Sequence, residues 1–160
     1  MDDVDKILAQ WKTERPDLNN QSMGLIGRLQ RLSHHLVRDM EMTFNEFGLN
    51  LSNFDVLATL RRSGPPYQLS PGELLSTMMI ASGTLTNRID QLAKSGYIKR
   101  IQNPDDGRSV FIALTNKGFD TIDAAVTAHV ATQIRLTSAL SPKEMHDLDH
   151  LLKNFLKNFE

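Results

Sequence analysis

The sequence predicts a mainly α-helical protein with one small β-hairpin, and three observations support this fold class. Apolar residues recur at three- and four-residue steps over most of the 160 residues, which is typical of amphipathic helices. The segment 97–114 is instead rich in strand-forming residues on both sides of a turn at 103–108. Breakers and capping residues separate the helical segments, and Gly64-Pro65-Pro66 is the clearest breaker.

Three helices are expected before that breaker. The first covers residues 2–12, and Pro16 ends the helical region because a proline disfavours the α conformation of the residue before it. A long helix runs from about residue 21 to Phe47, where Gly48 stops it. The third begins within 51–54, with Ser52 as its expected N-cap.

Two serine-proline pairs mark the starts of later helices. Ser70-Pro71-Gly72-Glu73 and Ser141-Pro142-Lys143-Glu144 both carry a capping serine and a proline at the first helical position. Between them, a helix is expected over 81–95, and Thr115-Asn116-Lys117-Gly118 leads into another after the hairpin.

The order of elements from residue 69 to 114 indicates a function. A short helix, a tight turn, a second helix and a β-hairpin form a winged helix-turn-helix, which places its second helix in the DNA major groove. Double-stranded DNA is therefore the expected partner.

The faces of the helix at 81–95 agree with this role. Leu85, Ile89 and Leu92 form one apolar stripe, and the opposite face is small and polar. Asparagine pairs well with adenine, arginine with guanine, and hydroxyl groups with phosphate. The same faces would suit an ordinary amphipathic surface helix, but the basic hairpin that follows favours DNA reading. The expected DNA-binding residues are Ser82, Thr84, Thr86, Asn87, Arg88, Lys94, Arg100 and Arg108.

The tip of the hairpin offers two interpretations. Asp105-Asp106-Gly107 makes the turn, and Arg108 stands beside it, where it could grip a phosphate or enter the minor groove. An Asp–Arg pair that only stabilises the turn is the alternative, and both can hold together.

The amino-acid composition limits the functions, partners and cellular locations that are expected. With 18 basic and 19 acidic residues, any DNA contact depends on local positive charge, which gathers at 88–108. The absence of cysteine excludes disulfides and thiol-based redox sensing. The acidic start MDDVDKIL is not a signal peptide, and no stretch is long and apolar enough to span a membrane. We expect a cytoplasmic protein with no membrane partner and no cofactor.

The apolar helices outside the reading unit indicate a symmetric homodimer, although a monomer with one closed core is the alternative. A two-fold dimer places two reading helices about 34 Å apart, so that it reads a pseudo-palindrome. The expected division is residues 1–47 for the N-terminal helix and first dimerisation helix, 48–114 for the DNA-binding domain, and 115–160 for the C-terminal dimerisation helices.

Nearly the whole chain resembles the MarR family of winged-helix transcriptional regulators. The resemblance rests on the long first helix, FDVLATL at 54–60, the segment 69–100, DDGRS in the wing and ALTNKG at the start of the helix after it. It implies a homodimeric regulator, usually a repressor, that leaves DNA when a small phenolic or other aromatic ligand binds.

A narrower resemblance points to the urate-responsive, PecS-like branch of that family. Trp11 on an extra N-terminal helix, ERPDL at 14–18, Asp55 in FDVL and Arg88 in TNRID carry it. The resemblance implies a ligand site made by Trp11, Asp55 and Arg88, for an aromatic anion such as urate or salicylate. Packing of Trp11 and a structural salt bridge of Asp55 are the alternative roles. A link between Asp55 and Arg88 would couple ligand occupancy to the reading helix.

Three other functions are possible for a chain of this kind. An enzyme is not expected, because the sequence has no nucleophile elbow, P-loop or Rossmann fingerprint. A metal-sensing regulator is the main alternative, since His34-His35 with Asp39, and His146 with His150, have spacings that a helix could use for zinc. No metal residue is assigned from these pairs. A winged helix used for protein contact is the third possibility.

Overall fold

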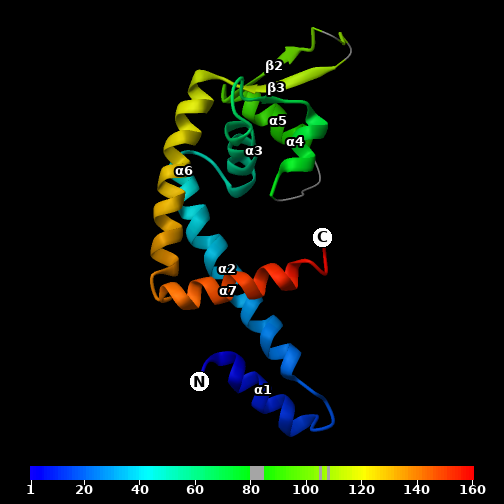
Figure 1. Cartoon of the computed structure of the whole chain (residues 1–160), viewed down its shortest axis with the longest axis vertical. Coiled ribbons are helices and arrows are strands. Elements are labelled where there is room, and N and C mark those ends of the chain that lie inside the picture. The colour runs from blue at the N-terminus through cyan, green and yellow to red at the C-terminus, as the bar shows by residue number, and fades with distance from the viewer. Residues whose placement is uncertain (80–84, 105, 108) are drawn as a thin grey trace. The chain divides into compact units, whose positions relative to one another are not determined.

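The computed structural model describes residues 1–79, 85–104, 106–107 and 109–160 (Figure 1). Within these residues, the elements are α1 (Asp3–Glu14), α2 (Gln21–Asn45), α3 (Leu51–Arg62), β1 (Gln68–Leu69), α4 (Pro71–Thr77), α5 (Leu85–Lys94), β2 (Ile98–Gln102), β3 (Val110–Leu114), α6 (Asn116–Thr137) and α7 (Pro142–Leu156). The predicted class, mainly helical with a small β wing, is confirmed. No described helix has the length and apolar character needed to cross a membrane.

The chain forms two compact units, residues 1–39 and residues 40–160. The boundaries expected from the sequence, at 47/48 and 114/115, stay a prediction.

In the N-terminal unit, α1 packs on the first turns of α2. Asp2 caps α1 by accepting from the Asp5 N–H, and Asp5 completes the capping box. Val4 is buried, and Gly24 lets Leu8 approach, because a Cβ at Gly24 would lie 2.9 Å from Leu8 Cδ1.

Acidic residues at the start of α1 pair with basic residues of α2. The Arg28 guanidinium lies 2.7 Å from an Asp2 oxygen and 2.5 Å from an Asp5 oxygen, and Arg31 lies 3.0 Å from Asp3. We call these five residues the α1–α2 clasp. The Arg28 hydrogen bond is the main reason that the pKa of Asp2 falls to about 2.

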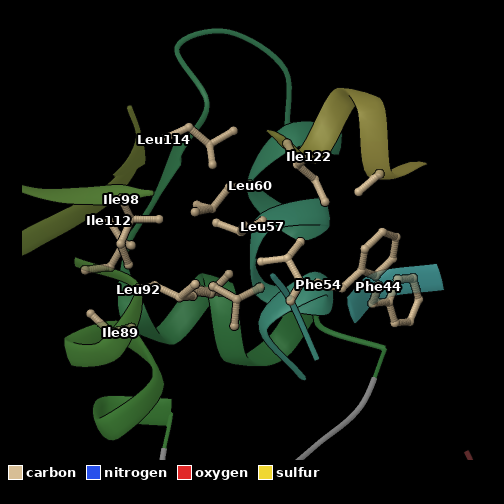
Figure 2. Close-up of a cluster of buried hydrophobic side chains, with 14 residues drawn as sticks. Phe44, Phe54, Leu57, Leu60, Ile89, Leu92, Ile98, Ile112, Leu114 and Ile122 are labelled. Atoms are coloured by element: carbon tan, nitrogen blue, oxygen red, sulfur yellow. The ribbon is translucent and has the colours of Figure 1, made fainter. Parts of the chain in front are cut away.

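The core of the C-terminal unit surrounds α3. Figure 2 shows Leu57 and Leu60 of α3 facing side chains from the wing and from α6. The fully buried or nearly buried members include Val56, Leu57, Leu60, Leu74, Leu92, Ile98, Ile112 and Ile122. At about 25 cal/mol per Å² of apolar surface, this burial is the main stabilising contribution to the unit.

The sheet contains a strand that the sequence did not predict. Its order is β1-β3-β2, with both pairs antiparallel, and Arg100 lies opposite Ile112 in the hairpin. β1 has only two residues, Gln68 and Leu69. They form a strand because they pair with the edge of β3 that β2 does not occupy. Periodicity cannot reveal so short a strand.

Helix α3 begins differently from the sequence-based expectation. The N-cap of α3 is Asn50, whose side chain accepts from the Asn53 N–H at 2.8 Å, so the expected cap Ser52 is wrong. Asn50, one residue before the helix, satisfies the otherwise free N–H of Asn53, and Ser52 lies inside the first turn. The first residues of the helix expected at 81–95 fall outside the described residues, and α5 is described from Leu85.

The junction between α5, β2 and α6 fixes the end of the reading helix. The Thr115 hydroxyl donates to the carbonyl of Gly96 at 2.6 Å, and the Lys117 ammonium donates to that of Ser95 at 2.7 Å. Gly118 lies against Tyr97 so closely that a Cβ there would be 1.9 Å from the Tyr97 carbonyl oxygen. The start of α6 is therefore built around the C-terminal end of α5.

Candidate nucleic-acid interface and ligand site

The described part of α5 has the two faces expected of a reading helix. Ile89 and Leu92 are buried in the core, whereas Thr86, Asn87 and Lys94 are exposed. Polar side chains with donors and acceptors are therefore available to a groove from a helix fixed by its apolar face. Ser82 and Thr84 lie outside the described residues.

Arg88 lies between these two faces. The side chain is half-buried, and its Nη1 atom is fully buried with no hydrogen-bond partner among the described residues. An unpaired buried donor costs about 1–3 kcal/mol, so an anion placed there would be stabilised. Arg88 is therefore better placed than Thr86 or Asn87 to serve a buried ligand.

Arg100 joins the wing to the reading helix. Its guanidinium lies 2.5 Å from the Asp90 carboxylate of α5, and both side chains are partly exposed. This pair orients β2 against α5, so any contact of Arg100 with DNA would be made beside an acidic neighbour. Its assignment as a DNA-binding residue stays a prediction.

The wing tip is closed by backbone and amide groups. The Ser109 N–H donates to the Asp106 carbonyl at 3.0 Å, and Gln102 Nε2 donates to the Gly107 carbonyl at 2.9 Å. Asp105 and Arg108 lie outside the described residues, and so does an Asp–Arg pair formed by them.

Asp55 is a buried carboxylate in the second turn of α3. Its side chain is only 7% exposed, and Oδ1 accepts a hydrogen bond from the Met79 N–H at 3.3 Å. The same oxygen lies 4.0 Å from Nη1 of Arg62. No ion pair between Asp55 and Arg88 is found within the described part of the chain, and a link between them stays a prediction.

Arg62 is a residue that the sequence analysis missed. Besides facing Asp55, its Nη2 donates to the carbonyl of Thr77 at the end of α4. Seven residues separate Asp55 from Arg62, which places both on one face of α3 at about 100° per residue. That spacing is the signal that could have identified the pair.

Trp11 lies in the other unit. It is 42% exposed on α1, in the half of the helix that follows Val4 and Leu8. Asp55 and Arg88 belong to the unit formed by residues 40–160, so a site that unites all three residues stays a prediction.

His129 of α6 forms a second buried polar position. Its ring centroid lies 5.1 Å from that of Phe44 and 5.0 Å from that of Phe54. Nδ1 is buried without a hydrogen-bond partner in the described residues, and burial lowers the pKa of the imidazole.

The histidine pairs do not assemble a metal site in the described ranges. No group of three or more His, Cys, Asp or Glu side chains there could hold a metal ion. The rings of His34 and His35 meet edge to face at 5.9 Å, and His150 Nε2 hydrogen-bonds the Asn154 amide at 2.9 Å.

Comparisons with known proteins agree with this geometry. The MarR family profile matches residues 49–110. The chain is 40% identical over 150 residues to the HTH-type transcriptional regulator PecS of Dickeya dadantii (strain 3937), which covers 94% of this chain and 90% of that protein. It is 28% identical over 138 residues to the multiple antibiotic resistance protein MarR of Escherichia coli (strain K12), covering 80% and 90% of the two chains.

Solved structures show the same fold. A putative MarR-like transcription regulator from Bacillus cereus ATCC 10987 aligns with a TM-score of 0.79 at 21% identity, covering 89% of this chain and all of that one. A mutant Escherichia coli MarR in complex with operator DNA aligns with a TM-score of 0.74 at 25% identity, covering 86% and 96%.

Proposed function

Because this chain belongs to the MarR family of transcriptional regulators, we propose that it represses transcription as a homodimer and leaves its operator when a small aromatic anion binds. Family membership makes the chain a DNA-binding regulator rather than an enzyme. The single observation that supports repression and release is the arrangement of α5. It exposes Thr86, Asn87 and Lys94, while Arg88 keeps a buried nitrogen that has no hydrogen-bond partner among the described residues.

The homodimer is supported by the apolar surface of α7. None of the residues of α7 is buried within this chain, although its apolar side chains recur at helical spacing. Such a face on a soluble protein marks a contact surface, and a second copy offers the same face by two-fold symmetry. The exposed apolar side chains of α7 are Met145, Leu148, Leu151, Leu152, Phe155 and Leu156, and Phe159 follows just beyond the helix.

An anionic aromatic ligand is supported by the buried guanidinium nitrogen of Arg88. This nitrogen, which has no partner in the part of the chain that the structure describes, can donate a charge-assisted hydrogen bond to a carboxylate or urate-like oxygen. Asp55 has a side chain that is 7% exposed and lies in the same unit, so a ligand bound near it would alter its contacts with Arg62 and Met79. Urate and salicylate are the two probes that fit this chemistry.

The decisive experiment is genome-wide selection of DNA sites with the pure protein, repeated with urate and with salicylate. The proposal expects pseudo-palindromic sites with half-sites about one duplex turn apart, steep weakening by salt, and loss of binding with one of the anions. Binding without sequence preference, or selected sites without two-fold symmetry, would contradict it.

A further inference from the structure

The last two residues of α3 are both arginines, and their side chains contact different elements of the protein. Arg61 lies 2.8 Å from the Asp123 carboxylate of α6 and stacks over the ring of Phe119, with 4.5 Å from its guanidinium carbon to the ring centroid. Arg62 instead reaches the Thr77 carbonyl and the Asp55 carboxylate. One arginine therefore anchors α3 to α6, and the other anchors α3 to the helix-turn-helix.

Arg62 and Asp55 together hold the end of α4. Arg62 binds the carbonyl of Thr77, the last residue of α4, and Asp55 accepts from the N–H of Met79 two residues later. We call Asp55, Arg62 and residues 77–79 the turn bridge. Because a guanidinium is planar and donates through several N–H groups, it can bind both partners in a single orientation.

The turn bridge lies where the chain passes from α4 toward α5. A helix-turn-helix reads DNA through the placement of its second helix relative to the first. Loss of either contact to residues 77–79 would weaken the hold of α3 on the end of α4, the first helix of the helix-turn-helix.

We propose that Arg62 is a positioning residue of the switch, which couples the charge at Asp55 to the placement of the reading helix through the turn bridge. This inference rests on the proposed release of DNA by an aromatic anion. An anion beside Asp55 adds a like charge to a buried carboxylate and an opposite charge near Arg62. Arg62 then turns toward the anion, and its hydrogen bond to the Thr77 carbonyl breaks. The end of α4 is thereby released from α3.

The coupling can be tested without any ligand by a double-mutant cycle in DNA affinity. Full-length protein carrying Arg62→Gln, Asp55→Asn or both is titrated against the strongest DNA site that the selection yields. The effects on Kd are expected to depart from a simple product by about threefold or more, as is typical of residues that contact each other. The matched cycle of Arg61→Gln with Asp55→Asn removes the same charge one residue away and is expected to be multiplicative.

The switch is tested by the ratio of Kd with and without saturating urate. Arg61→Gln should keep the wild-type ratio, and in Arg62→Gln the ratio should fall toward one. Arg62→Lys keeps the charge but has one compact donor group, so an intermediate ratio of Kd values is expected. This variant decides the result if circular dichroism shows that Arg62→Gln folds poorly. A wild-type ratio in Arg62→Lys together with a multiplicative Arg62–Asp55 cycle would overturn the proposal. If urate and salicylate leave wild-type binding unchanged, the proposed ligand class is wrong, while the cycle still decides whether Arg62 and Asp55 are coupled.

Discussion

Single side chains decide how closely the reading helix and its neighbours approach. Gly118 lies in the first turn of α6 directly against the Tyr97 carbonyl, and Thr115 and Lys117 hold the carbonyls that end α5. Only a residue without a Cβ fits at position 118. Any side chain there would displace the backbone of Tyr97 rather than a flexible side chain.

Gly118→Ala is expected to lower the free energy of unfolding by about 1–3 kcal/mol, because the new Cβ overlaps the Tyr97 carbonyl. Chemical denaturation followed by circular dichroism measures this change. Gly72→Ala is the matched control, since nothing lies within 4 Å of a Cβ there and its φ is not positive. Equal stability of the two variants would show that the close approach at Gly118 is not required.

Asn87 is the exposed amide nearest the start of the described part of α5. Asn87→Ala is expected to weaken binding to the selected site by about 1–3 kcal/mol and to relax the preference at one base pair, because a bidentate amide–adenine contact is lost. Binding to single-base variants of the site measures both effects. Asn154→Ala on α7 is the control amide and should leave affinity unchanged; a uniform loss over all base variants would assign Asn87 to phosphate instead.

At the scale of elements, capping sequences determined where most helices begin. Ser70 and Ser141 cap α4 and α7 with the predicted capping boxes, and the serine hydrogen bonds lower the pKa of Glu73 and Glu144. These interactions join residues three apart, so the sequence alone reveals them. The missed strand β1 depends on a partner more than 40 residues away, which local pattern cannot supply.

The α1–α2 clasp makes the docking of α1 sensitive to acid. Arg28 lowers the pKa of Asp2 from 3.8 to about 2, so the folded state favours the ionised carboxylate. The contribution is fully present above pH 3.8 and is lost as pH falls through about 2. In Arg28→Gln, the loss of docking is expected at a higher pH, nearer 3.8.

Fluorescence of Trp11, the single tryptophan, follows this transition during acid titration, and far-ultraviolet circular dichroism follows the whole fold. Arg15→Gln is the matched control, because Arg15 pairs with Asp17 two residues away and joins no second helix. Identical fluorescence midpoints in wild type and Arg28→Gln would mean that the clasp does not hold α1.

At the scale of the whole molecule, α7 has an apolar face that the described residues do not cover. Leu151 is 64% exposed in the middle of that face. Leu151→Glu is expected to convert a dimer into a monomer and to weaken operator binding, because a carboxylate in an apolar contact loses its hydration and one half-site is lost. Light scattering after size exclusion measures the mass.

Leu75→Glu is the control for this experiment. Leu75 is 50% exposed on α4, outside the proposed contact surface, so its variant should keep the wild-type mass. A Leu151→Glu protein that remains dimeric, or a monomeric wild type, would contradict the proposed use of α7.

The sequence by itself determined the helices, the wing and the polar face of α5, because periodicity, caps and breakers act over a few residues. It also indicated the family through motifs that cover nearly the whole chain. Only the tertiary structure decided that Asp55 faces Arg62, that Arg100 pairs with Asp90, and that Arg88 keeps a buried nitrogen without a partner in the described residues. These facts depend on which helices and strands meet in space and on how far packing shields a side chain from water. Neither is a property of local sequence.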